Sequence, residues 1–206
     1  MKKIKWVILA GVLILVAWGI YQNPDRRTDR TELEAIFTDS QQMRSDIQAD
    51  VSQIQDCFTD NEIEVDLAIT TKCLNGLTSV IVKVDNEKII VYRLEEYHKS
   101  HKEDLDNETK KIVEDSIKLN NSAEYKAVLA ATKSFYDAHI DYYTFLQNNL
   151  QDKTVDDLSE SELLNLVAIG NRTESTWQEV QNKQTVFKNY VLQNYGQEFL
   201  DYLGFN

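Results

Sequence analysis

Apolar side chains recur every three or four residues along 33–58, with acidic, amide and hydroxyl side chains between them. This spacing places the apolar positions on one face of a helix of about seven turns. The stripe consists of Leu33, Ile36, Ser40, Met43, Ile47, Val51, Ile54 and Phe58. The pattern predicts a helix of the coiled-coil or bundle type, with this stripe facing its neighbours.

Two further stripes follow in the C-terminal half of the chain. The first runs from Tyr125 to Leu150 and is rich in aromatic residues, so we expect its helix to contact two neighbours. The second runs from Leu163 to Leu203, and Gly170 predicts a kink or a break within it. With the first stripe, these patterns predict a mostly all-α protein, an antiparallel bundle of long amphipathic helices.

Helix starts are predicted where a hydroxyl or amide side chain precedes an acidic residue by three positions. In this capping box the two side chains satisfy free backbone N–H groups at the helix N-terminus. The full motif begins at Thr31, Thr59 and Ser159, and a weaker version begins at Asn121.

Two structures compete for residues 62–105. A stripe of helical spacing continues through the whole stretch, which favours a helix at the centre of the bundle. Val80–Val84 and Ile89–Tyr92, however, are rich in β-branched residues. Asp85–Glu87 could form the turn between them, which makes a small β-hairpin at 77–94 the alternative. We favour the helix because the stripe persists through both β-prone segments.

The chain contains two cysteines, Cys57 and Cys73, which form either a disulfide or two buried thiols. If a turn at 59–61 joins two helices, Cys73 lies about 18 Å up the second helix. A disulfide requires Cα atoms within about 7 Å of each other. The bond therefore predicts that residues 59–72 fold back as a loop or short strand, with the second helix beginning near Thr71.

The most apolar segment is 6–21, which follows a short basic start and carries no charged side chain. Its 16 residues are slightly fewer than the usual lower limit of about 17 for a membrane-spanning helix. Aromatic side chains at both ends, Trp6 on one side and Trp18 with Tyr21 on the other, favour the two membrane interfaces. We therefore predict a retained single-pass anchor that contacts the lipid bilayer. A cleaved secretory signal is the alternative, although Ala17-Trp18-Gly19 is a poor cleavage site.

Basic residues flank both sides of the predicted span. Three lysines precede it, and Arg26, Arg27 and Arg30 follow at a greater distance. Because positive charge close to the span favours the cytoplasmic side, we predict a cytoplasmic N-terminus and an extracytoplasmic C-terminal domain. The reversed orientation is the alternative. The predicted organisation is an anchor or uncleaved signal at 1–21, a polar linker at 22–30 and an acidic helical domain at 31–206.

Charge excludes one class of partner. The first 30 residues carry a net charge of +4, so the remaining 176 residues hold −16 and the whole chain −12. A domain this acidic repels phosphate backbones, so we expect no nucleic-acid partner. The same charge keeps it away from an anionic membrane surface.

One cluster has the composition of a metal site. Glu95, His98 and His101 are spaced three apart, which places them on neighbouring turns of one helix face, and carboxylate and imidazole ligands suit zinc or iron. Bundle di-iron sites, however, use two Glu-x-x-His pairs from different helices, and Lys99 and Lys102 repel a cation. A solvated charged turn is therefore the favoured interpretation.

A second set of residues is a candidate ligand pocket. It comprises an aromatic group around one histidine: Phe135, Tyr136, His139, Tyr142 and Tyr143. Aromatic residues at helical spacing are more often core, and we favour that interpretation. No nucleophile elbow, glycine-rich phosphate loop or Cys-x-x-Cys redox pair is present, so the chain shows no catalytic or cofactor-binding motif.

The sequence thus predicts a membrane-anchored, extracytoplasmic and non-enzymatic module that binds another protein or itself through a helical face. A small-ligand-sensing ectodomain that works through a partner is the first alternative. A metal-dependent enzyme that uses the Glu95, His98 and His101 cluster is the second alternative.

Overall fold

The computed structural model describes residues 30–58, 67–150 and 153–202. The predicted membrane anchor at 6–21, most of the linker and the predicted cap at Thr59 lie outside these ranges. Within them, no helix combines the length and the apolar character that crossing a bilayer requires. The described part of the chain is helical and contains no strand.

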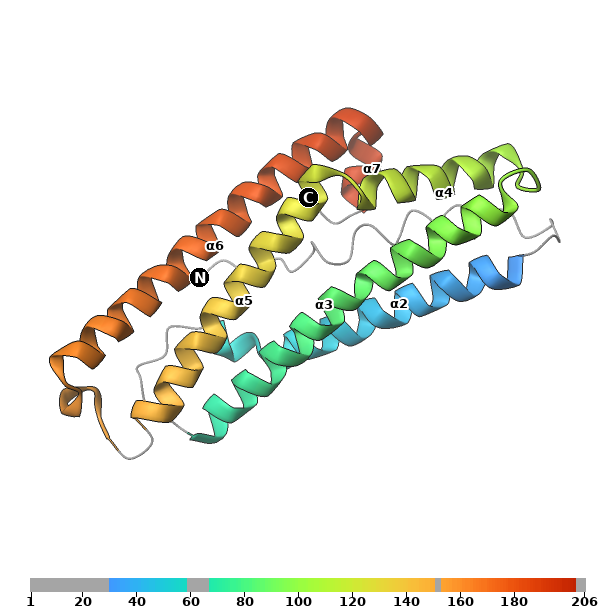
Figure 1. Cartoon of the computed structure of the whole chain (residues 1–206). Helices are drawn as coiled ribbons and strands as arrows, with labels where there is room; N and C mark the ends of the chain where they lie inside the picture. The colour runs from blue at the N-terminus through green and yellow to red at the C-terminus, as the bar shows by residue number, and fades with distance from the viewer. Residues whose placement is uncertain (1–29, 59–66, 151–152, 203–206) are drawn as a thin grey trace.

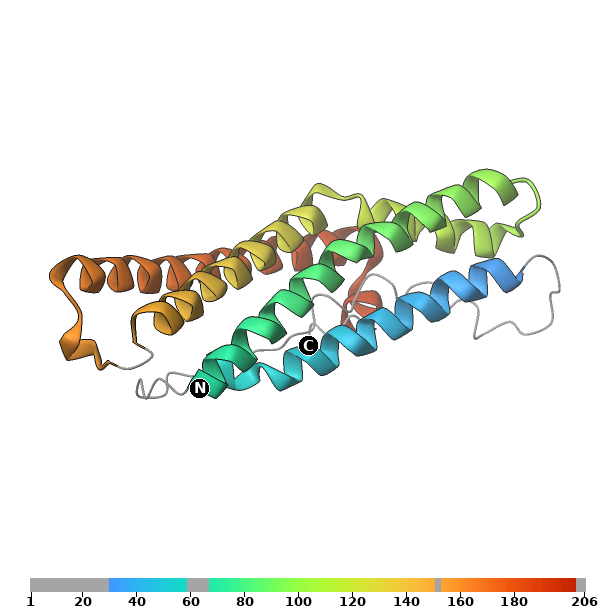
Figure 2. The same cartoon turned by 60° about the horizontal axis from the view of Figure 1, so that its bottom comes forward.

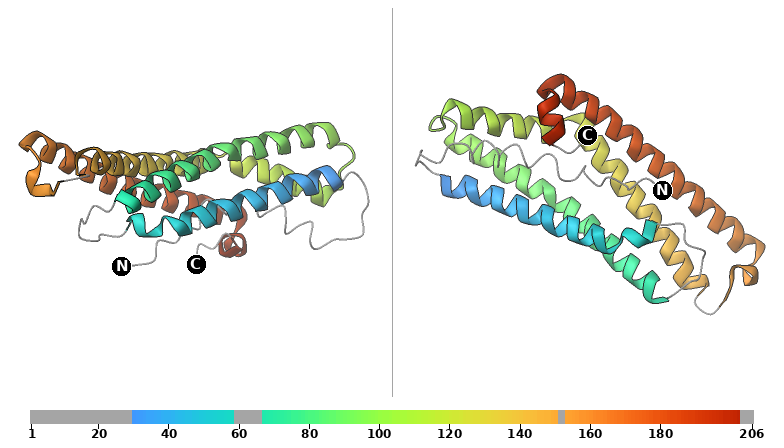
Figure 3. Two further views of the ribbon diagram at one scale, coloured as in Figure 1. Left: turned by 90° about the horizontal axis from the view of Figure 1, so that it is seen from below. Right: turned by 180° about the vertical axis from the view of Figure 1, so that it is seen from behind.

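The main helices are α2 (Arg30–Gln53), α3 (Leu67–His101), α4 (Asn107–Asn120), α5 (Ala123–Asn149) and α6 (Glu160–Tyr195). Shorter pieces are the 3-10 turns η2 (Gln55–Phe58) and η3 (Val155–Asp157) and the terminal helix α7 (Gln197–Tyr202). They form an elongated bundle in which α2 lies along α3 and α6 lies along α5 (Figures 1 and 2). Helix α3 contacts α2, α4 and α5, and α5 contacts α3, α4 and α6, so these two helices connect the parts of the bundle (Figure 3).

Ion pairs between α2 and α3 define their antiparallel register. Asp39 pairs with Arg93 at 2.6 Å, and Asp50 pairs with Lys83 at 2.6 Å. Moving forward along α2 from Asp39 to Asp50 therefore corresponds to moving backward along α3. Because these side chains are partly exposed, they contribute to register more than to stability.

The apolar core has three connected parts. The largest joins the C-terminal half of α2 to α3, α5 and α6. A second joins the start of α2 to the end of α3 and to α4, and a third joins α4, α5, α6 and α7. The first predicted stripe lies in this core, with six of its eight residues buried and Met43 and Phe58 half-buried. The prediction of a helical bundle is confirmed.

The first half of α6 differs from the prediction in two respects. Helix α6 runs from Glu160 to Tyr195 through Gly170, so the expected break at this glycine is wrong. A side chain added at Gly170 would meet nothing within 4 Å, so no close contact requires a glycine at this position. Leu163, Leu164 and Val167 are exposed, because the first turns of α6 pack only their other face against the bundle.

The alternative of a β-hairpin at 77–94 is wrong, because α3 is continuous through this segment. Its β-branched residues are divided between two environments: Val80, Val84 and Ile90 are buried against neighbouring helices, whereas Val82 and Ile89 are exposed. Tertiary burial on one face of the helix therefore overrides the local β propensity.

Cys57 and Cys73 form a disulfide with a Cα–Cα distance of 5.8 Å. Helix α3 nevertheless begins at Leu67, so the start predicted near Thr71 is four residues too late. The disulfide and the earlier start of α3 are compatible because α2 ends at Gln53. The turn η2 then places Cys57 beside the second turn of α3, which contains Cys73. Next to this bond the residue that follows α2 lies close to α3: a Cβ on Gly76 would clash with Ile54 Cγ2.

The predicted caps have mixed outcomes. Ser159 forms the full capping box, because its backbone N–H donates to Glu162 at 2.7 Å and its hydroxyl accepts from the Glu162 N–H. Thr31 is not a cap, since α2 already includes Arg30. At the weaker motif the N-cap lies one residue later than predicted: Asn121 is the C-cap of α4, and Ser122 is the N-cap of α5.

Candidate functional site

The junction between α4 and α5 organises a candidate site within the described part of the chain. The Ser122 hydroxyl accepts from the Tyr125 N–H at 3.1 Å and donates to the Leu119 carbonyl at 2.7 Å, which fixes the change of direction. Asn121 donates a hydrogen bond of 2.6 Å to the Glu95 carboxylate, so the junction is tied to α3. The first turns of α5 are thereby held opposite the middle of α3.

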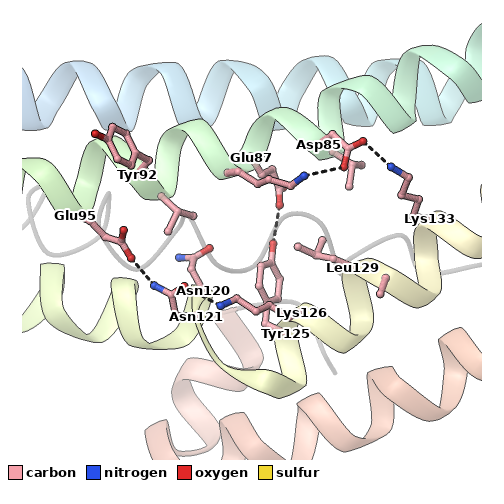
Figure 4. A pocket seen from close by; sticks show the side chains of 14 residues that line it. Asp85, Glu87, Tyr92, Glu95, Asn120, Asn121, Tyr125, Lys126, Leu129 and Lys133 are labelled. Atoms are coloured by element: carbon pink, nitrogen blue, oxygen red, sulfur yellow. Dashed lines mark hydrogen bonds and ion pairs between the residues drawn. The ribbon is translucent and has the colours of Figure 1, made fainter.

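A pocket of about 460 Å³ lies at this place, between α3 and the α4–α5 junction (Figure 4). This volume is in the range of small-molecule sites, about 300–1,000 Å³. Apolar side chains from both helices line it, namely Val84, Val91, Leu129 and Ala130. The pocket is therefore an apolar cleft between two helices of the bundle, into which a few polar groups converge.

Glu87 is the most unusual group in this pocket, because its side chain is only 5% exposed. Its Oε2 accepts a hydrogen bond of 2.8 Å from the hydroxyl of Tyr125, which is 2% exposed (Figure 4). Burial raises the pKa of the Glu87 carboxyl to about 7, although the hydrogen bond from Tyr125 opposes the shift. Burial and the nearby carboxylate raise the pKa of Tyr125 well above its ordinary value. The carboxyl therefore titrates much closer to neutral pH than an exposed glutamate does.

The other charged groups of the pocket are already engaged. Lys133 and Lys88 pair with Asp85 at 2.7 and 3.4 Å, and Lys126 donates to the side-chain oxygen of Asn121 at 3.0 Å. Hydrogen bonding from Lys133 lowers the pKa of Asp85 and raises that of Lys133 itself. Among the lining residues, Glu87 therefore combines deep burial with the absence of a cation in contact.

The three residues of the predicted metal cluster each interact with a different partner. Glu95 accepts from Asn121, His98 Nε2 lies 3.2 Å from a Glu114 oxygen, and the His101 ring stacks on Tyr97 at 4.5 Å between centroids. Across the described ranges, no group of three histidine, cysteine, aspartate or glutamate side chains is placed to hold a metal ion. Glu95 instead lines the pocket of Figure 4.

The residues of the predicted aromatic pocket pack against one another and against η2. The Phe58 ring lies 5.4 Å from Phe135 and 4.9 Å from His139, and the Tyr143 hydroxyl donates to the Cys57 carbonyl at 2.8 Å. Burial lowers the pKa of His139, whose Nδ1 lies 2.9 Å from the Phe135 carbonyl oxygen. Tyr136 is fully buried and Tyr142 half-buried in the same core. These contacts place the group beside the disulfide, in the largest part of the core.

The Glu87 pocket was missed by sequence reasoning, although one signal was available. Glu87 stands three residues after Val84 and four before Val91, so it occupies a position of the apolar stripe. An acid in a core stripe indicates either a paired charge or a functional site. Its partner Tyr125 could not be identified, because it follows 38 residues later on another helix.

The fold and the site define a helical-bundle domain with a small-molecule-sized pocket around a buried acid. No family model, curated protein or solved structure matches the chain. The function is therefore inferred from the geometry of the site.

Proposed function

We propose that this chain is a non-enzymatic binding domain that takes a small organic molecule into the pocket between α3 and α5. The proposal rests on one observation: an apolar cleft of about 460 Å³ has a buried, hydrogen-bonded carboxyl in its wall. With the predicted anchor at 6–21, the domain would be held at a membrane and pass on ligand occupancy through a partner. This proposal develops the ligand-sensing alternative that the sequence suggested.

Occlusion of the pocket tests the proposal. Ala130 lies on an accessible part of the wall, so Ala130→Trp would fill the mouth with little disturbance of the core. The matched control is Val167→Trp, because Val167 is 59% exposed on α6 and does not line the pocket. The full 206-residue chain in lipid nanodiscs would be screened against small organic compounds by ligand-observed NMR, with empty nanodiscs subtracted.

We expect compounds that bind the wild type and Val167→Trp but lose binding to Ala130→Trp. A screen without such compounds, or with binding that survives the occlusion, would contradict a ligand-binding function for this pocket.

A second candidate function is protein binding through the outer face of α3. Val82 and Ile89 are 54% and 55% exposed, and their spacing of seven residues places them on one side of the helix; Tyr92, 61% exposed, continues this side to the edge of the pocket, which it also lines. Apolar residues at this spacing form the seam of coiled coils. This exposed stripe supports binding to another helix, from a partner protein or from a second copy of the chain.

Charge substitution within this stripe tests the second function. Val82→Lys with Ile89→Lys should abolish crosslinks between the chain and its partner, or its self-association, in native membranes. Val186→Lys is the control, since Val186 is equally exposed on α6. If the wild type forms neither a complex nor an oligomer, or if the double variant forms them unchanged, the stripe is not a binding face.

A further inference from the structure

The buried carboxyl of Glu87 determines which chemical class of ligand suits the pocket. Its described partner is the neutral hydroxyl of Tyr125, which reaches one of its two oxygens. A buried carboxylate is stable when a cation and further hydrogen bonds compensate for its lost hydration. Within the pocket no residue supplies this cation, because the lysines are held by Asp85 and Asn121.

The surroundings of Glu87 suit the apolar part of such a ligand. Val84, Val91 and Leu129 provide walls that would contact a hydrocarbon or aromatic body. Tyr92 and Tyr125 add aromatic side chains, which attract cations through their ring faces. The net charge of −12 on the chain also favours the approach of positively charged molecules.

An anionic ligand is less suited to this geometry. Its charge would lie close to the Glu87 carboxyl and would have to keep that group protonated. The lysines at the mouth would also need to leave Asp85, to which Lys133 is bonded at 2.7 Å (Figure 4). A cation requires neither change, because it adds to Glu87 the partner that the protein does not supply.

We propose that the pocket binds an organic cation, a protonated amine on an apolar body, whose N–H groups donate to the Glu87 carboxylate. This inference rests on the proposed ligand-binding function and names the ligand class. The ammonium group would lie beside Glu87 and Tyr125, and the apolar body would extend between Val91 and Leu129.

Three probes with one apolar body and different charges test the class: 4-phenylbutylamine, 4-phenylbutanol and 4-phenylbutyrate. Their dissociation constants would be measured by calorimetry at pH 8 with the full chain in phosphatidylcholine nanodiscs. Because a charge-assisted hydrogen bond is lost with the alcohol, we expect the amine to bind roughly tenfold to a hundredfold more tightly. The carboxylate probe should bind most weakly.

Glu87→Gln removes the charge while keeping an oxygen that can accept from Tyr125. The advantage of the amine over the alcohol should disappear in this variant. Glu96→Gln is the matched control, because it removes one charge from the exposed side of the same helix, outside the pocket. It should leave the preference for the amine unchanged.

Proton linkage in the wild type provides a measurement that needs no variant. The charged groups around Glu87 are Asp85, Lys88 and Glu95 from α3 and Lys126 and Lys133 from α5, while the end of α4 and its C-cap contribute the neutral Asn120 and Asn121. Amine binding favours the ionised carboxyl and releases its proton. Since the free carboxyl has a pKa of about 7, affinity should rise roughly tenfold from pH 6 to pH 8. An amine remains protonated throughout, like the lysine side chain.

Each contrary outcome has a distinct meaning. Equal binding of the three probes, abolished by Ala130→Trp, would overturn the cation preference and leave the ligand-binding function standing. Tighter binding of 4-phenylbutyrate, or proton uptake on binding, would also overturn it. If none of the three probes binds, the cation class fails, and the broader compound screen decides separately whether the pocket binds any ligand.

Discussion

The Tyr125 hydroxyl donates a hydrogen bond of 2.8 Å to Glu87 and so joins the beginning of α5 to the middle of α3. Both side chains are almost completely buried, and both lie in the wall of the pocket. The hydrogen bond partly compensates for the lost hydration of the carboxyl, but it supplies no charge. We therefore expect the site to respond to pH and, under the proposed function, to a ligand that brings a positive charge.

The raised pKa of Glu87 predicts that stability falls as pH increases from about 5 to 7. The folded protein keeps this proton up to about pH 7, whereas the unfolded chain releases it near the ordinary value of 4.5. The folded state thus binds more protons in this window, and stability decreases with pH until both states are ionised. Equilibrium urea unfolding should show a loss of about 3 kcal/mol attributable to this group.

Glu87→Gln provides the reference for this pH dependence. His139 acts in the opposite direction below its ordinary pKa of 6.5, because burial lowers its pKa and favours the neutral ring in the fold. Subtracting the unfolding free energy of Glu87→Gln from that of the wild type at each pH removes this contribution. A difference that stays constant between pH 5 and pH 8 would contradict a raised pKa at Glu87.

Two glycines should respond in opposite directions to substitution by alanine. A methyl group on Gly76 would clash with the buried Ile54, so Gly76→Ala should cost about 1–2 kcal/mol despite its better helix propensity. Gly170→Ala meets no atom within 4 Å and should stabilise α6 by about 0.5–1 kcal/mol. Urea unfolding of both variants checks the contrast, and equal effects would show that Ile54 does not lie close against α3 at Gly76.

Removal of the disulfide should destabilise the domain. The bond closes a loop with a sequence separation of 16, for which chain entropy predicts a contribution of about 3 kcal/mol. Cys57→Ala with Cys73→Ala should therefore lower the urea midpoint of the wild type in oxidising buffer. A reductant should produce a similar shift in the wild type and none in the double variant. Identical midpoints for oxidised and reduced wild type would contradict a stabilising bond.

The disulfide also bears on the predicted membrane topology. Such bonds persist in oxidising compartments, so the bond and the predicted extracytoplasmic orientation can be tested together. A reporter enzyme that is active only outside the cytoplasm, fused after Asn206, should therefore be active. Alkylation of intact cells should find Cys57 and Cys73 protected until a reductant is added. An inactive reporter together with freely alkylated cysteines would indicate the reversed orientation.

Local sequence signals were sufficient where a helix depends on its own neighbours. The stripe from Leu33 to Val51 predicted the buried face of α2, and the Ser159 motif predicted the start of α6. Both depend on interactions within four residues along one helix, which spacing alone reveals. The same reasoning was wrong for Leu163 and Leu164, because exposure depends on which neighbour the bundle provides.

The site required information that no local pattern contains. Glu87 could be seen as an acid within an apolar stripe, but its contact with Tyr125 spans 38 residues and exists only once α3 and α5 pack together. The Glu95, His98 and His101 cluster is the opposite case, because its local pattern suggested a metal site. In the fold, Glu95 and His98 contact residues outside α3, and His101 contacts the backbone of its own helix.

By itself, the sequence determined that this chain is helical, acidic and patterned for a bundle, because spacing and charge are properties of neighbouring residues. It also carries the prediction of a membrane anchor at 6–21. Only the tertiary structure decided that the β-prone part of α3 is helical, that Cys57 reaches Cys73, and that a pocket surrounds Glu87. The physical reason is common to all three: each depends on burial and contact between segments distant in the chain, which packing of the helices creates.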